Sequence, residues 1–246
     1  MEVHAHTHTP RKKWTHYFWE FLMLFLAVFC GFLAEYQLEH KIEHDREKQY
    51  IRSMVADIEE NNRLINSQLS LQKVRMKRMD TLIALCNNPA SIRGNEGAFY
   101  YLGRISPRLN TVRLNSRTYE QLKNSGNFRL IRDMKSSDMI IAYYEDLPLL
   151  RQLEELYQKE FDQYKILASR IFDPAVFIRM ETSDGGITRT EDNPALQSYD
   201  PSVIKQFNVF AVYMNGSARG ILQQSEELLT KGEALLAYLK KEYHLK

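Results

Sequence analysis

Histidine and cysteine are nearly missing from most of this chain. The seven histidines are His4, His6, His8, His16, His40, His44 and His244. The stretch from 45 to 243 therefore has no histidine, and its only cysteine is Cys86. Imidazole is the commonest general base, and imidazole and thiolate are the usual zinc ligands. The sequence thus predicts a protein that is not an enzyme, although carboxylate, Lys, Tyr and Ser side chains leave other chemistry open.

Net charge and helix-breaking residues are also scarce. The formal net charge is +2, so no overall electrostatic field attracts nucleic acid, and no nucleic-acid partner is expected. Cys30, the other of the two cysteines, lies in an apolar run, so the pair does not indicate a disulfide framework. Neither Pro nor Gly occurs between 32 and 88. One long helix is therefore expected through this stretch.

The apolar run is the strongest signal that is present. Residues 21–34 read FLMLFLAVFCGFLA, and aromatic flanks extend the segment to the 21 residues of 17–37. A membrane-spanning helix needs about 20 apolar residues, with Trp and Tyr at its ends. We predict a transmembrane helix over 14–38, against the alternatives of a buried core helix and a cleaved signal peptide. Phe at the −3 position of each candidate cleavage site disfavours the signal peptide.

Basic residues next to this segment predict its orientation. Arg11, Lys12 and Lys13 form a compact cluster directly before it, whereas the basic residues after it are interspersed with acidic ones. Cytoplasmic flanks carry an excess of Lys and Arg. Residues 1–13 are therefore expected to form a short cytoplasmic tail. Residues 39–246 are expected to form a periplasmic helical domain anchored in a bacterial inner membrane.

Apolar residues spaced alternately by three and four predict three long helices in the remainder. They cover 51–86, 136–171 and 201–243, and shorter helices are expected at 95–105 and 116–125. Asp200 and Pro201 suit the cap and the first turn of the last helix. The predicted fold is all-α, with the transmembrane helix continuing into an up-down-up-down bundle.

The connection from 172 to 200 is long for a compact domain, which is typical either of a binding loop or of a disordered link. Residues 177–190 read FIRMETSDGGITRT, with Asp-Gly-Gly between two β-prone runs. This pattern predicts a small β-hairpin at the distal tip of the bundle.

The chain also resembles a known family. Residues 116–131 read SRTYEQLKNSGNFRLI, and 140–147 read IIAYYEDL. Together with the N-terminal span, these segments resemble a family of bacterial single-span envelope proteins known only as a domain of unknown function. The resemblance covers about residues 14–150 and implies an inner-membrane anchor, without an activity or site residues. The matching positions are Tyr119, Leu122, Lys123, Ser125, Gly126, Asn127, Leu130 and Ile131.

The histidines provide candidate metal ligands, with zinc or another divalent metal as the ion. His4, His6 and His8 alternate, so they share a side of an extended chain. His40 and His44 share a helix face and match an H-x-x-E-H spacing. Antiparallel helices at 45–86 and 201–243 are expected to bring His244 near them. Solvated histidines without metal are the alternative at each position, and no cofactor is required.

Small residues on one face of the span predict helix pairing in the membrane. Ala27, Gly31 and Ala34 share this face with Glu20. Small residues four apart permit close helix approach, and a carboxylate on the same face then points at a partner. An interfacial Glu20 that reaches the lipid headgroups is the alternative.

The function that these patterns favour is a membrane-anchored helical interaction or sensory module. It is expected to contact lipid and to work in a homo-oligomer or with other membrane proteins. Two alternatives remain, a metal-dependent membrane enzyme that uses the juxtamembrane histidines and a channel or transport accessory subunit.

Overall fold

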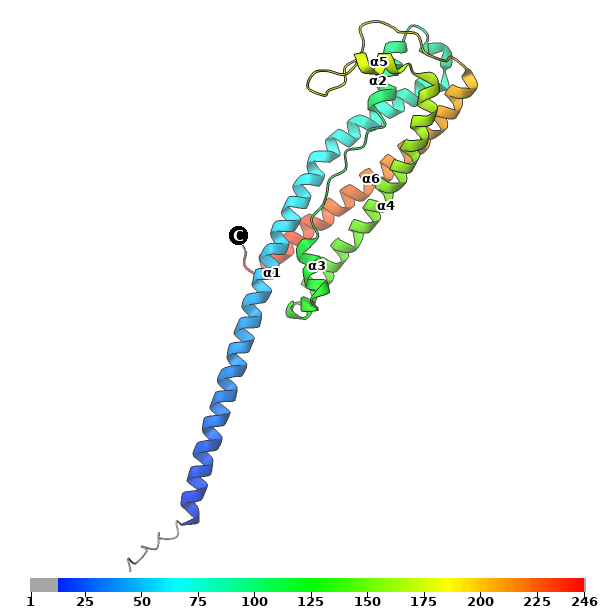
Figure 1. The fold of residues 1–246 in the computed structure, drawn as a ribbon. Helices are drawn as coiled ribbons and strands as arrows, with labels where there is room; N and C mark the ends of the chain where they lie inside the picture. The colour runs from blue at the N-terminus through cyan, green and yellow to red at the C-terminus, as the bar shows by residue number, and fades with distance from the viewer. Residues whose placement is uncertain (1–12, 246) are drawn as a thin grey trace, which may run out of the picture. The chain divides into compact units, whose positions relative to one another are not determined.

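The computed structural model describes residues 13–245 and divides the chain into two compact units, unit 1 at 1–50 and unit 2 at 51–246. The described part is helical and contains no β-strand, so the predicted all-α class is confirmed. Figure 1 labels the α-helices. The elements are α1 (Trp14–Asn87), η1 (Pro89–Ile92), α2 (Glu96–Ile105), α3 (Arg117–Asn124), η2 (Asn127–Leu130), α4 (Met134–Ile171), α5 (Pro174–Arg179) and α6 (Pro201–Glu242).

The described part of unit 1 is almost entirely the first half of α1. This helix has 74 residues and includes the predicted span. Within 13–245 it is the one helix long and apolar enough to cross a membrane, judged by length and composition alone. None of its most apolar window is buried.

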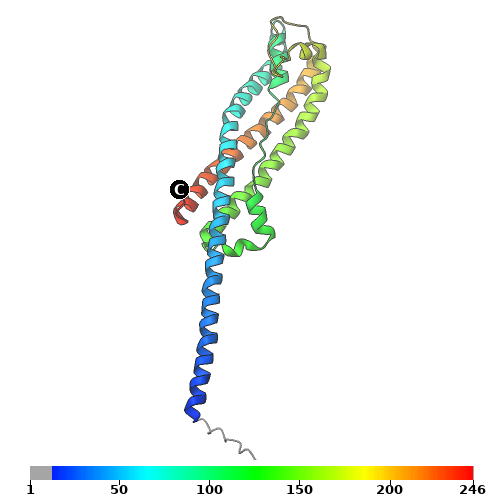
Figure 2. The same cartoon turned by 60° about the vertical axis from the view of Figure 1, so that its left-hand side comes forward.

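Three long helical segments form the frame of unit 2. Tyr238 of α6 contacts Asp133 at the start of α4, and Ser217 contacts Glu160 farther along, so α4 and α6 run antiparallel. In the same way Lys240 pairs with Glu59, near the start of the unit 2 part of α1, and Asn208 bonds Asn87 at its end. α6 is thus antiparallel to α1 as well, and Figures 1 and 2 show the three side by side.

The chain between α1 and α4 is not one helix. It consists of α2, an extended segment at 106–116, and α3 with η2. Tyr164 Oη donates to the Gly103 carbonyl at 2.8 Å, and Tyr157 Oη donates to the Pro107 carbonyl at 3.0 Å. Two tyrosines of α4 therefore satisfy backbone acceptors where this passage leaves its helix.

An aromatic cluster fills the core at one end of unit 2. Phe172 and Phe207 lie with ring centroids 5.8 Å apart, and Phe207 and Tyr164 are at 4.5 Å. Phe99 and Tyr100 of α2 complete the cluster, and all five side chains are essentially inaccessible to solvent. Rings of this size dominate core energetics, so the cluster fixes α2 against α4 and α6.

Local chemistry sets the helix boundaries. The Asp200 carboxylate accepts from Ser202 N at 2.8 Å with Pro201 in the first turn, which confirms the predicted start of α6. Gly126 adopts a left-handed φ of 67° after α3, as expected for a residue that ends a helix. Pro148 lies inside α4, which continues through it.

The predicted hairpin at 177–190 is wrong. A turn does form, with Thr182 N donating to the Gly186 carbonyl, but the only pairing within the described residues is an isolated antiparallel bridge between Glu181 and Ile187. The first residues of the first β-prone run belong to α5. Asp173 caps this helix by accepting a 2.8 Å hydrogen bond from Ala175 N. The hairpin therefore lacks its first strand, and the pairing does not extend beyond the single bridge.

Candidate functional site

The predicted packing face of the span is open in unit 1. Glu20, Ala27, Gly31 and Ala34 are all exposed, and a Cβ added at Gly31 meets no atom within 4 Å. Glu20 also forms an ion pair with His16, whose Nε2 lies 3.0 Å from Glu20 Oε1. The i,i+4 spacing of this pair is a signal that the sequence interpretation missed. Nothing in unit 1 covers Gly31, and helix pairing through this face stays a prediction.

The histidines within the described residues contact residues close to them along the chain. The His40 ring lies 4.2 Å from the Tyr36 ring, and His44 Nδ1 lies 3.5 Å from Glu47 Oε2. His244 follows α6 with a positive φ of 52°. Across residues 13–245, no group of three or more His, Cys, Asp or Glu side chains is placed to hold a metal ion. A metal site at His40, His44 and His244 stays a prediction.

The alternating histidines His4, His6 and His8 lie outside the described residues. Their predicted metal binding therefore has no structural observation to support it or to contradict it.

A buried polar cluster joins α1 to the start of α3. Asp57 is 4% exposed and accepts from Asn115 Nδ2 at 2.6 Å, and from Thr118 N and Oγ1 at 3.2 and 2.5 Å. Asn61 exchanges two hydrogen bonds with the Asn115 backbone, at 2.9 and 2.6 Å. We call these four residues the clasp. Asp57 acts as the cap of α3 from another helix, a role that Ser116 at the N-cap position does not fill.

The segment at 116–131, which carries the family resemblance, includes Thr118 of the clasp and residues of the core of unit 2. The Tyr119 ring stacks on the Tyr144 ring at 4.6 Å, and Tyr143 contacts Tyr144 edge-on. Burial raises the pKa of Tyr143 to about 12, so its hydroxyl stays protonated. Tyr119 and Leu122 are thus core residues of unit 2.

An arginine-lined hollow lies beside the clasp. Its volume is about 430 Å³. An adjoining, more apolar hollow of about 210 Å³ shares Arg113, Leu114 and Arg151 with it. We call the two together the arginine groove. The first hollow is lined by Arg113, Leu114, Asn115, Ser116, Arg117 and Arg151. The second adds Thr111, Val112, Leu147, Leu150 and Glu154.

The sequence interpretation missed this groove, although the sequence has a signal for it. Residues 97–119 contain four arginines and neither Asp nor Glu, which departs from the even charge balance of the whole chain. Two of these arginines, Arg113 and Arg117, line the groove, and Arg151 joins them from α4. The sequence alone does not show that Arg151 joins Arg113 and Arg117, because 34 positions separate 117 from 151. Only the fold brings α4 beside the extended segment.

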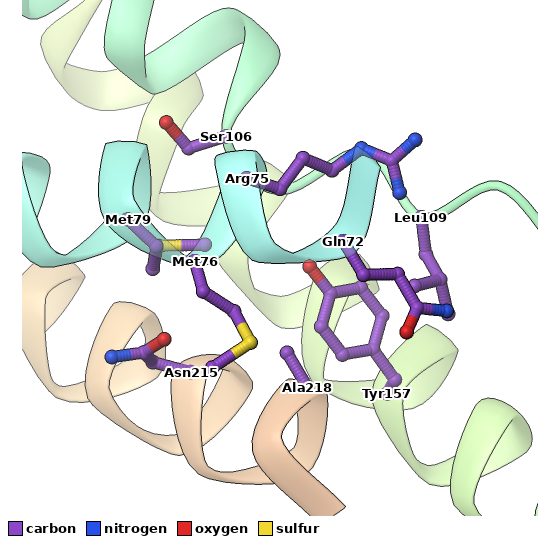
Figure 3. A pocket seen from close by; sticks show the side chains of 9 residues that line it. All are labelled: Gln72, Arg75, Met76, Met79, Ser106, Leu109, Tyr157, Asn215 and Ala218. Atoms are coloured by element: carbon purple, nitrogen blue, oxygen red, sulfur yellow. The ribbon is translucent and has the colours of Figure 1, made fainter. Parts of the chain in front are cut away.

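A smaller cavity lies between α1, α4, α6 and the extended segment at 106–116 (Figure 3). It encloses about 20 Å³, room for about one water molecule. Within the described chain, Gln72 Oε1, Ser106 Oγ and Asn215 Oδ1 have no hydrogen-bond partner, and all three residues line the cavity. The cavity therefore suits a bridging water better than an organic ligand.

The cysteine of unit 2 is placed as a core residue. Cys86 is buried, and burial raises the pKa of its thiol to about 12. The thiolate is the reactive form of cysteine, so this side chain is inert near neutral pH.

Comparison with protein-family models, with curated proteins and with solved structures finds no match to this chain.

Proposed function

We propose that the protein is a non-enzymatic, membrane-anchored helical interaction module. The observation that carries the proposal is the exposed apolar surface of α1 in unit 1. The exposed large apolar side chains there are Trp14, Tyr17, Phe18, Trp19, Phe21, Met23, Leu24, Phe25, Leu26, Val28, Phe29, Phe32, Leu33, Tyr36, Leu38 and Ile42. They occur on every side of the helix, whereas a helix that packs on a core has one apolar stripe.

The energetic argument favours lipid as the covering. Burying one such side chain is worth about 1.5–3 kcal/mol, and the whole set would be too unfavourable to leave in water. The segment has the length of a bilayer span, and its Trp and Tyr residues lie at the two ends, where membrane interfaces place them. We place residues 1–13 in the cytoplasm and the domain at 39–246 outside it, in a bacterial inner membrane.

The interaction part of the proposal rests on the face of Glu20, Ala27, Gly31 and Ala34. Gly31 leaves open space where a Cβ would lie, so a second helix has room to approach closely. Glu20, which pairs with His16 along the same helix, lies on this face, where a carboxylate would point at a neighbouring helix. We propose that the span associates with a second copy or with another membrane protein. Chain direction alternates from α1 to the segment at 106–116, then to α4 and to α6. This alternation supports an up-down-up-down bundle as the attached domain.

The membrane anchor is tested by alkaline carbonate extraction of membranes that contain the full chain. We expect the protein to remain in the membrane pellet. Leu26→Arg combined with Phe29→Arg should release it, because each Arg near the centre of a span costs about 2.5–3.5 kcal/mol. Leu71→Arg combined with Val74→Arg is the matched control, since these two exposed residues belong to the same helix in unit 2.

The control should stay in the pellet with the unmodified chain. Extraction of the unmodified chain by carbonate would contradict the anchor. Orientation is tested separately, with a reporter that is active only outside the cytoplasm fused after residue 246. An inactive fusion at that end, together with an active one at the N-terminus, would reverse the proposed orientation and leave the anchor intact.

A further inference from the structure

We propose that the arginine groove of unit 2 binds a phosphate-type oxyanion that has an apolar body. Three guanidinium groups line its larger hollow, and none of the residues lining that hollow is acidic. Guanidinium presents a planar fork of donors that fits phosphate oxygens, and such charge-assisted bonds are about twice as strong as neutral ones. The groove thus has the chemistry of an anion site that the sequence patterns did not predict.

The three arginines come from separate elements. Arg113 belongs to the extended segment, Arg117 is the first residue of α3, and Arg151 lies on α4. Arg117 N already donates to Asn115 Oδ1 at 3.0 Å, and Thr118 N donates to Asp57. These first amides of α3 are therefore occupied. An anion in the hollow would be held by side chains, so the site does not depend on the helix N-terminus.

Nearby carboxylates offset only part of the charge of the hollow, because two of them, Asp57 and Glu154, face three arginines. Asp57 lies 3.8 Å from Arg117 Nη2, but the Asp57 oxygens also accept from the clasp residues Asn115 and Thr118. Glu154 lines only the adjoining hollow. Burial raises the pKa of Glu154, with the Arg151 charge acting in the opposite direction. A bound anion would place its charge among three arginines, of which Arg117 is 81% exposed in its side chain.

The backbone of the site is held before any ligand arrives. The clasp anchors Asn115 and Thr118 on either side of Arg117, and Leu114 is buried beside it. A preorganised site loses little conformational entropy on binding. Side chains of Val112, Leu114, Leu147 and Leu150 line the adjoining hollow, which suits the apolar part of a ligand.

The ligand class that follows is a phosphate monoester or diester on an apolar body. Two sources supply that chemistry, a phospholipid headgroup and a soluble phosphate ester. Inorganic pyrophosphate probes the anion requirement alone. Short-chain phosphatidic acid adds the acyl body, and short-chain phosphatidylcholine has the same body with its charge balanced by choline.

Calorimetric titration of the full chain in an uncharged maltoside detergent tests the site. We expect saturable binding of phosphatidic acid that weakens as salt is raised, with weaker binding of phosphatidylcholine. Arg113→Gln combined with Arg151→Gln should lower the affinity about tenfold or more, because the two lost charge-assisted bonds together are worth at least a factor of that order. Arg52→Gln combined with Arg170→Gln removes the same charge from exposed positions outside the groove and should leave the affinity unchanged.

The outcomes are distinguishable. Binding of pyrophosphate as tight as that of phosphatidic acid, lost in the groove variant, supports the anion site and overturns the apolar body as part of the ligand. Binding of phosphatidic acid alone, lost in the same variant, supports a lipid headgroup. Equal binding by the groove and control variants, or no saturable binding of either probe, overturns the proposal. Unchanged thermal unfolding of both variants, followed by circular dichroism, shows that folding is not the cause.

Discussion

The two halves of α1 present the same kind of residue to opposite environments. In unit 1, Phe25 and Phe29 stack along the helix at 5.9 Å and both remain exposed. In unit 2, Ile51 and Ile58 lie on one stripe and are completely buried. Apolar residues all around a helix suit lipid, whereas an apolar stripe suits a helical bundle. The comparison shows that the arrangement of apolar residues, more than their number, separates an anchor from a core.

Buried polar residues join the helices of unit 2. Within unit 2 several lie inside the bundle, including Asn62 and Gln72 of α1 and Asn208 and Asn215 of α6. Asn208 Nδ2 donates to Asn87 Oδ1, and Asn215 Nδ2 donates to Asp80 Oδ1, each at 2.7 Å. Such pairs fix the register of two helices, because a shift of one turn leaves buried polar groups without partners.

The largest contrast is expected from two phenylalanines. Phe207→Ala should reduce the free energy of unfolding of unit 2 by about 3–5 kcal/mol, because it removes a fully buried ring from the aromatic cluster. Phe25→Ala should change it by less than about 0.5 kcal/mol, because Phe25 is exposed in unit 1. Urea unfolding followed by circular dichroism measures both, since the only tryptophans, Trp14 and Trp19, lie in unit 1. Similar losses from both variants would break the comparison.

Two glycines give a smaller contrast. A Cβ at Gly103 would lie 2.5 Å from Phe172 Cζ, a ring held in the core, so Gly103→Ala should cost about 1–3 kcal/mol through overpacking. Gly31→Ile should leave unfolding of unit 2 unchanged and weaken association of the span by about 1–2 kcal/mol. Thermal unfolding measures the first effect, and energy transfer between labelled copies in membranes measures the second. A span that is monomeric in membranes would remove the association face from the proposal.

Much of the helical frame was predictable because its signals are local. The three-and-four spacing predicted a helix over 51–86, in which Ile51, Ile58 and Cys86 are buried, and Asp200 caps α6 as expected. The hairpin prediction failed because Asp173 and Pro174 form a competing helix start directly before the first β-prone run. Both signals were present in the sequence, and the helix cap prevailed over β propensity.

The candidate sites were much harder to predict, because they depend on distant residues. Asp57 and Asn61 look like solvent-facing positions of α1, and their burial follows only from Asn115 and Thr118. The arginine groove likewise needs α4 to bring Arg151 to Arg113. Periodicity reports which face of a helix is apolar, but it does not report which polar residues a neighbouring segment will cover.

The smallest expected effect concerns pH and a single carboxylate of unit 2. Asp133 caps α4, accepting from Ser136 N and Oγ at 2.7 Å each and from Tyr238 Oη at 3.0 Å. The hydrogen bond from the Ser136 side chain is the main cause that lowers the pKa of Asp133 below its ordinary value. A carboxylate with a lowered folded pKa stabilises the fold fully above its unfolded pKa of about 3.9, and this contribution is lost as pH falls through the folded pKa.

Asp133→Asn should therefore reduce the stability of unit 2 at pH 7, by at most the roughly 1 kcal/mol typical of a helix cap. The difference from the unmodified chain should begin to shrink below the unfolded pKa of about 3.9, and should be lost as pH falls through the lower pKa that Asp133 has in the folded chain. Glu20→Gln is the matched control in unit 1, because Glu20 is an exposed carboxylate far from this cap in sequence. Urea unfolding at a series of pH values measures both variants. If the Asp133→Asn difference stayed constant from pH 7 to pH 2, the charge of Asp133 would have no part in capping α4, and the cap would act through hydrogen-bond geometry alone.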